Sequence, residues 1–210
     1  MILRFPLLAR PNTRKGWEKV QSHAMEGLSL FGGAAKDEHM KNEVRILGLD
    51  PGLRRTGWGI IESQGSRLKW IAHGVIKPDE KAPFADRLLA LFDGVNDLIE
   101  AYRPDEAAVE ETFLNSNPGS SMKLGHARAA SLIAPARAGL IVAEYSTKEI
   151  KKSVVGTGGA DKDQVAFMVK RLLPAAGNVS ADAADALATA IMHAHASTLG
   201  TKIKRWGDAA

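Results

Sequence analysis

The spacing of hydrophobic residues divides the chain into strand-like and helix-like segments. A short apolar run over 45–50 ends at an acid and a Pro-Gly turn signal, and strand-like segments follow over 57–63 and 68–76. Beyond these, we expect helices over 84–102, 120–138, 147–154, 162–173 and 181–198, and strands over 106–112 and 140–145. Three antiparallel strands followed by alternating helix and strand predict an α/β fold with a mixed five-stranded sheet flanked by helices.

The first 43 residues lack sustained periodicity. We interpret 1–43 as an extension, either a dispensable tail or the result of a start assigned upstream of Met40. The excess of basic residues over 1–24 also fits a transit peptide. The folded domain is therefore expected over 44–199, with a C-terminal tail over 200–210.

Composition and charge narrow the classes of function. The formal net charge is +4 and the isoelectric point about 9.3, which is compatible with a polyanionic partner. The sequence has no cysteine, which excludes disulfides, thiolate metal sites and a cysteine nucleophile. The absence of cysteine also favours a cytoplasmic protein. No apolar run approaches the ~20 residues of a membrane span.

Four acids in three separate segments are the candidates for chemistry. Asp50 ends the first strand and Glu110 lies in the fourth, where acids are costly unless they are paired or bind metal. The carboxyl ends of strands are also where ligands gather in α/β sheets. Asp182 and Asp185 share one helical face, beside alanines that permit close packing. Asp182 alone would also suit a capping role in the first helical turn.

Gathered in one pocket, four carboxylates would repel one another strongly unless cations neutralised them. Hard oxygen ligands select Mg²⁺ or Mn²⁺ over zinc or copper. Two such ions about 4 Å apart can activate a water and stabilise the leaving oxygen of a phosphodiester. The four acids together therefore favour metal-dependent phosphodiester hydrolysis.

Five segments resemble, in order and with compatible spacing, the motifs of the RuvC family of bacterial Holliday-junction resolvases. They are LGLDPGLRRTGWGII (47–61), VEETF (109–113), KLGHARA (123–129), VVGTGGADKDQV (154–165) and ADAADALA (181–188). The resemblance implies a ribonuclease-H-like nuclease that cuts four-way DNA junctions as a homodimer, by paired symmetric nicks that leave 5′-phosphates. It also implies a role in recombination and repair beside a branch-migration motor complex (RuvA and RuvB).

Position by position, the same resemblance assigns the four acids as ligands of two Mg²⁺ ions per subunit, for which Mn²⁺ may substitute. Phe113 matches an aromatic residue that wedges against bases, although a core phenylalanine is the simpler alternative. Lys151 and Lys162 match basic residues near DNA, although a solvated surface charge is the usual fate of lysine. Lys162 follows a Gly158-Gly159 loop and could stabilise charge that develops on the scissile phosphate.

A polar loop is expected over 115–123, after the catalytic strand. We expect contacts to the DNA backbone from Lys123 and Arg128, which lie at the end of this loop and after it. Arg54, close to Asp50 in the sequence, also fits such a contact. His193 and His195 lie two turns or more beyond the last acid, and we interpret them as ordinary helix residues.

Three rival functions remain at this point. An actin-like or sugar-kinase ATPase has a similar first phosphate loop but needs two such lobes, and one copy of the motif occurs here. A junction-binding scaffold would not need all four acids. Another nuclease of the same superfamily, acting on RNA or transposon ends, is disfavoured only by the resemblance between Phe113 and Lys162.

Overall fold

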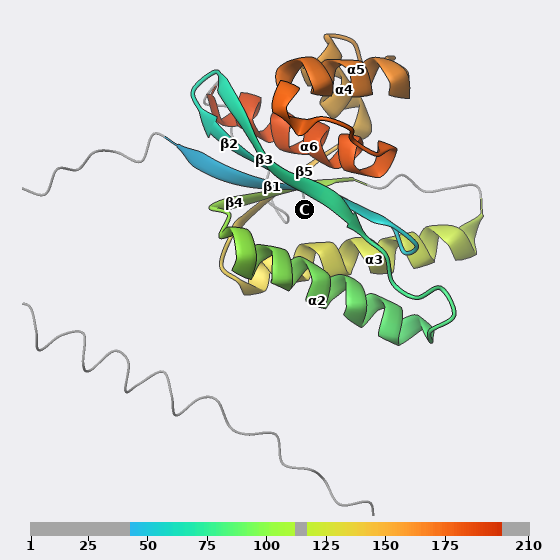
Figure 1. Ribbon diagram of the computed structural model, residues 1–210. Coiled ribbons are helices and arrows are strands. Elements are labelled where there is room, and N and C mark those ends of the chain that lie inside the picture. Colours follow the sequence, from blue (N-terminus) through green and yellow to red (C-terminus); the bar gives the residue numbers. More distant parts are fainter. Residues whose placement is uncertain (1–42, 112–116, 199–210) are drawn as a thin grey trace, which may run out of the picture. The chain divides into compact units, whose positions relative to one another are not determined.

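The computed structural model describes residues 43–111 and 117–198 (Figure 1). The predicted tail over 200–210 and all of the predicted extension except Glu43 lie outside the described residues. The elements, in chain order, are β1 (Val44–Asp50), β2 (Thr56–Gln64), β3 (Arg67–Ile76), α2 (Phe84–Tyr102), β4 (Glu106–Glu110), α3 (Pro118–Arg137), β5 (Ile141–Tyr145), α4 (Thr147–Val155), α5 (Lys162–Leu172), the short 3₁₀ helix η1 (Pro174–Ala176) and α6 (Ala181–Thr198).

The strands form one mixed five-stranded sheet in the order β3-β2-β1-β4-β5, as the sequence predicts. The two hairpin pairs, β1–β2 and β2–β3, are antiparallel, because short turns join them. The pairs β1–β4 and β4–β5 are parallel and are separated in sequence by helices. Because β1, β4 and β5 run in the same direction, their carboxyl ends meet at one edge of the sheet.

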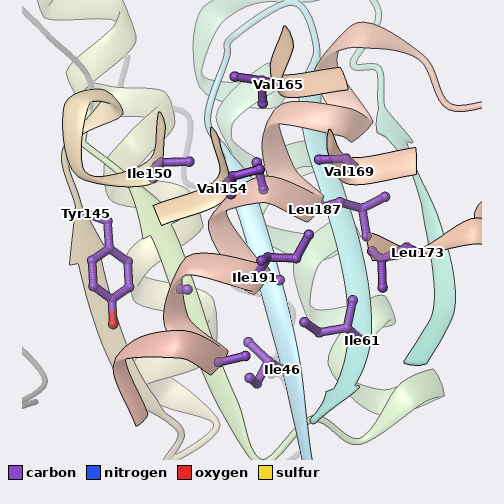
Figure 2. Close-up of a cluster of buried hydrophobic side chains, with 14 of the residues drawn as sticks. Ile46, Ile61, Tyr145, Ile150, Val154, Val165, Val169, Leu173, Leu187 and Ile191 are labelled. Atoms are coloured by element: carbon purple, nitrogen blue, oxygen red, sulfur yellow. The ribbon is translucent and has the colours of Figure 1, made fainter. Parts of the chain in front are cut away.

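Helices cover both faces of the sheet. In Figure 1, α2 and α3 lie on one face, and α4, α5 and α6 lie on the other. Figure 2 shows the core between the sheet and the second group, where Ile46 and Ile61 of the strands meet Leu187 and Ile191 of α6. A second buried cluster, which includes Leu49 and residues packed against it from α2 and α3, fills the opposite face.

Helix α6 packs on the sheet with almost no side chain between the two backbones. A Cβ built at Gly48 would lie 2.2 Å from the carbonyl oxygen of Ala186, and one at Gly57 would lie 1.9 Å from that of Asp182. Since real contacts at such distances do not occur, only glycine fits at these two strand positions. The alanines of α6 complete this close packing, and the helix therefore holds Asp182 directly over β2, opposite the end of β1.

Helix α3 differs from the prediction at its start. It begins at Pro118 and not at residue 120, so the expected polar loop over 115–123 is wrong from Pro118 onward. The Asn117 side-chain oxygen accepts a hydrogen bond from the Ser120 amide at 3.2 Å, and proline is well suited to the first helical position. Strand β4 also ends at Glu110, two residues before the predicted limit. Within the described ranges, no helix combines the length and apolarity that crossing a membrane requires.

Candidate active site

The carboxyl ends of the central strands and the start of α6 build one acidic pocket. Asp50 at the end of β1, Glu110 at the end of β4 and Asp185 in α6 line a hollow of about 290 Å³. Lys151 of α4 and Lys162 of α5 line the same hollow. The structure thus brings together three of the four predicted acids and both predicted lysines.

The fourth acid, Asp182, points toward a different partner. Its Oδ2 atom lies 2.7 Å from Nε of Arg55, a residue of the loop that follows Asp50. Gly57, which lies against the Asp182 carbonyl, pairs with Asp50 in the sheet, so Asp182 is near Asp50 and its charge contributes to the raised pKa of Asp50. Asp182 therefore lies beside the pocket. Its side chain forms an ion pair with Arg55, a contact that a helix cap alone would not require.

Crowding and burial make these acids unusual. Burial, followed by the negative charges of Glu110, Asp185 and Asp182, raises the pKa of Asp50 to about 8. Burial also raises the pKa of Glu110, against the effect of a 2.6 Å hydrogen bond that the Thr147 hydroxyl donates to its Oε1 atom. Burial likewise raises the pKa of Asp185, although the positive charge of Lys162 opposes the shift. As these side chains stand, ionisation of the acids is disfavoured.

The lysines supply part of the missing positive charge. Lys162 Nζ lies 3.5 Å from Asp185 Oδ2, and the negative charge of that carboxylate raises the pKa of Lys162. Lys162 is the first residue of α5, whose start is fixed by reciprocal hydrogen bonds between Asp161 and Gln164. The Lys162 side chain is 79% exposed, so it partly neutralises the site while remaining accessible from solvent.

The donor set matches a hard divalent cation in kind. All four acids offer carboxylate oxygens, which Mg²⁺ and Mn²⁺ prefer. As the side chains lie, no three histidine or acidic side chains of residues 43–111 and 117–198 are grouped so that they could hold one ion. The two aspartates of α6 are instead paired with Arg55 and Lys162. A bound cation would replace these basic groups as the partner of the carboxylates.

Comparison with known proteins decides the family. A model of the family described as crossover junction endodeoxyribonuclease RuvC matches residues 46–193. The chain belongs to the RuvC family. A RuvC of Caulobacter vibrioides is 71% identical over 151 residues, which cover 72% of this chain and 89% of that relative. The RuvC of Maricaulis maris is 60% identical over 165 residues, covering 77% and 99% respectively.

Solved structures of RuvC proteins have the same fold. The structure of Thermus thermophilus RuvC in complex with a Holliday junction substrate matches with a TM-score of 0.70 and 30% identity, over 75% of this chain and 97% of that one. The predicted ribonuclease-H-like fold is confirmed. Membership of the RuvC family also removes the actin-like ATPase from the rival functions.

The other predicted DNA contacts lie in different places. Arg54 and Lys123 both line a second pocket, and Arg54 also forms an exposed ion pair with Glu80 at 3.5 Å. Arg128 is bound to buried Glu144 of β5 and lines neither pocket, which favours a structural role for it. Phe113 lies outside the described residues.

Sequence reasoning missed two sets of polar contacts. Thr147 follows β5, the strand beside Glu110, and this adjacency in the parallel sheet was the available signal for its hydrogen bond. The interpretation of His193 and His195 as ordinary helix residues is incomplete. His193 is fully buried and bonded on both ring nitrogens, and His195 Nδ1 lies 2.9 Å from the hydroxyl oxygen of Ser153.

Proposed function

We propose that this chain resolves Holliday junctions in recombination and repair, by paired symmetric nicks that leave 5′-phosphate and 3′-hydroxyl ends. The observation that carries the proposal is the convergence of Asp50, Glu110 and Asp185, from three separate elements, on one pocket beside Lys162. Membership of the RuvC family supports the same activity. The convergence also speaks against a scaffold, because burial of mutually repelling acids has a cost that binding alone does not require.

The acids would hold two Mg²⁺ ions, for which Mn²⁺ may substitute, and these would supply a water of lowered pKa and a Lewis acid for the leaving oxygen. Asp50 and Glu110 offer donors from the rigid sheet, and Asp182 and Asp185 offer them from α6. Thr147 orients the Glu110 carboxylate through its 2.6 Å hydrogen bond.

Lys162 has a separate role in the proposal. It releases Asp185, to which it is held at 3.5 Å, and places its ammonium against the scissile phosphate, where negative charge develops. Lys151, from the neighbouring helix, adds a second positive charge at the same hollow.

A homodimer is supported by an apolar surface on α3 and β5. Ala129, Leu132, Ile133, Ala136 and Val142 line a hollow of about 240 Å³, and Ile133 is 56% exposed. Apolar surface of this kind favours association. A second copy of this chain suits the substrate, because a four-way junction has near two-fold symmetry and a C2 dimer presents two active sites to two like strands. Ile133→Glu should then sediment as a monomer.

Other parts of the proposal rest on the family alone. They are cooperation with a branch-migration motor complex (RuvA and RuvB) and a cytoplasmic location.

The activity is tested with a labelled synthetic four-way junction in Mg²⁺, beside linear duplex and an RNA–DNA hybrid. Symmetric nicks in the junction alone, lost in Asp50→Asn and in EDTA while junction binding remains, are expected. Junction binding without cleavage in Mg²⁺ or Mn²⁺ would identify a scaffold. Cleavage of the hybrid would identify another nuclease of the superfamily.

A further inference from the structure

A second pocket is lined in part by the loop that connects β1 to β2. Its volume is about 500 Å³, and it is lined by that loop, by α2 and by the start of α3. Four of its lining residues are basic and none is acidic: Gly52, Leu53, Arg54, Arg55, Arg87, Ser120, Lys123 and Leu124. This composition is the opposite of that of the acidic pocket, although Arg54 and Arg55 follow Asp50 by only a few residues.

Two of the four basic residues have no acidic partner. Arg55 pairs with Asp182 and Arg54 pairs with Glu80. By contrast, no carboxylate of the described part of the chain forms an ion pair with Arg87 or Lys123. The pocket therefore carries positive charge that the fold leaves uncompensated.

The Arg87 guanidinium is held in place by one hydrogen bond and has further N–H donors. Its Nη2 atom donates a hydrogen bond to the Leu53 carbonyl oxygen at 2.9 Å, which fixes the guanidinium against the loop. Its Nε atom is buried and has no hydrogen-bond partner among the described residues. The guanidinium has five N–H donors and the bond to Leu53 uses one of them, so Nη donors, rather than the buried Nε, remain available to an anion in the pocket. Guanidinium and phosphate are matched in geometry for such contacts.

The start of α3 adds to the positive electrostatic potential of this pocket. Ser120 lines the pocket in the first turn of this 20-residue helix, whose amino end carries partial positive charge. Arg87, Lys123 and the helix end thus approach one space from two different helices. An anion is the ligand class that this convergence favours.

We propose that this pocket binds a backbone phosphate of the cleaved DNA strand, with Arg87 and Lys123 as its direct contacts. The inference rests on the proposed nuclease function and names a second subsite for that substrate. Because a chain extends at most about 3.6 Å per residue, the Cα atom of Arg54 lies within about 14 Å of that of Asp50. Since phosphates follow one another along a strand about every 3.4 Å of helix axis, we expect the bound phosphate within the few nucleotides next to the cut.

The test compares charge removal inside and outside the pocket. Full-length Arg87→Gln, Lys123→Gln and the double variant are measured for binding of a synthetic four-way junction in EDTA over a series of KCl concentrations. Arg67→Gln is the matched control, since this exposed residue starts β3 at the end of the sheet opposite Asp50. The slope of log affinity against log salt should fall in magnitude by about 1 for each phosphate interaction removed per subunit, and remain unchanged in the control.

Neutral methylphosphonates at single positions near the cut locate the phosphate. Substitution at one position within a few nucleotides of the cut should weaken binding by the wild type and have no further effect on the double variant. Arg87→Lys should keep most of the salt dependence, because it keeps the charge.

A purely structural Arg87 gives a different result. Arg87→Gln would then lower the Tm but leave the salt slope equal to that of Arg67→Gln, and the inference would be overturned. If the wild type cleaves the junction while all slopes stay equal, only this inference fails. If the wild type neither binds nor cleaves the junction, the proposed function fails with it.

Discussion

The two ends of α6 bury polar side chains against the same sheet in opposite ways. At its last turns, His193 is fully buried, and its Nε2 atom donates to the Glu106 carboxylate at 2.6 Å. Its Nδ1 atom then accepts from the Tyr145 hydroxyl at 2.8 Å, so both ring nitrogens have a partner within the fold. At the first turn, Asp182 and Asp185 face other acids, and their basic partners come from an exposed lysine and a loop arginine.

The difference separates structural from functional polarity within one helix. A buried network whose members satisfy one another contributes to stability and specificity, and it needs nothing from outside. Buried acids that raise one another's pKa leave negative charge that Arg55 and Lys162 neutralise only in part, so an added cation would stabilise them further. Neutral substitutions at the acidic end of α6 should therefore preserve stability and lower activity, and substitutions at the histidine end should do the reverse.

The largest effect is expected at the acidic end. Asp185→Asn removes a proposed metal donor, and cleavage of the four-way junction should fall by more than about a hundredfold, since loss of outer-shell partners alone costs about 10–100-fold. Single-turnover cleavage and Tm are measured on the same preparations. A Tm that falls by more than a few degrees would contradict the separation of roles.

Gly57→Ala is expected to affect both stability and activity, because it displaces α6 from the sheet. The new Cβ would lie 1.9 Å from the Asp182 carbonyl oxygen, so α6 must shift away from β2. Overpacking of this kind costs about 1–3 kcal/mol. A displacement of about 1 Å at a catalytic group can cost about a hundredfold in rate.

The control for this variant is Gly125→Ala in α3, where a Cβ meets nothing within 4 Å. It should keep full cleavage activity and gain about 0.5–1 kcal/mol of helix stability. Equal behaviour of the two glycine variants in circular dichroism melts and cleavage assays would refute the close packing of α6.

His193→Leu should show its effect in stability and not in cleavage. The change leaves the Glu106 carboxylate and the Tyr145 hydroxyl without their partner, which costs about 3 kcal/mol, or about 6–12 °C in Tm for a domain of this size. The rate of cleavage per folded molecule, measured at low temperature, should stay within about threefold of the wild type. A large loss of rate without loss of Tm would assign His193 to the chemistry.

The smallest effect concerns pH and is measured in EDTA. Asp50 has a folded pKa of about 8, far above its ordinary value of 3.8, so between these values the folded state holds a proton that the unfolded state releases. Its contribution to stability is present below about pH 4 and is lost as pH rises to about 8. Asp50→Asn should therefore be more stable than the wild type at pH 8 by at least about 1 kcal/mol, with a smaller difference at pH 5. Urea melts at the two pH values measure this, and an equal difference at both would count against it.

Most of the fold could be predicted from local patterns. The hydrophobic period places β1 through α6 to within a few residues, and short turns dictate which strands are antiparallel. The start of α3 was misplaced because Ser, Asn and Gly suggest a loop, while Asn117 in fact caps the helix and Pro118 begins it. Polar composition alone does not distinguish a cap from a loop.

Three acids of the site, Asp50, Glu110 and Asp185, were predictable because each stands where its element should be apolar. Their partners were not, because those depend on contacts between distant segments. The pair Arg55–Asp182 joins the first loop to the last helix, and His193 meets Glu106 across 87 positions of sequence. The basic pocket has the same origin, since Arg87 and Lys123 belong to different helices.

The direct contact of α6 with Gly48 and Gly57 determines how the site can adjust. Where two backbones are in direct contact, no side chain between them can change its rotamer to absorb a movement. The amide protons of β2 and of the first turns of α6 should therefore exchange with solvent only when the domain unfolds globally. Motion at the pocket is then left to the lysines of α4 and α5. The enzyme would hold its acids in a fixed frame and fit its positive charges to whichever strand enters.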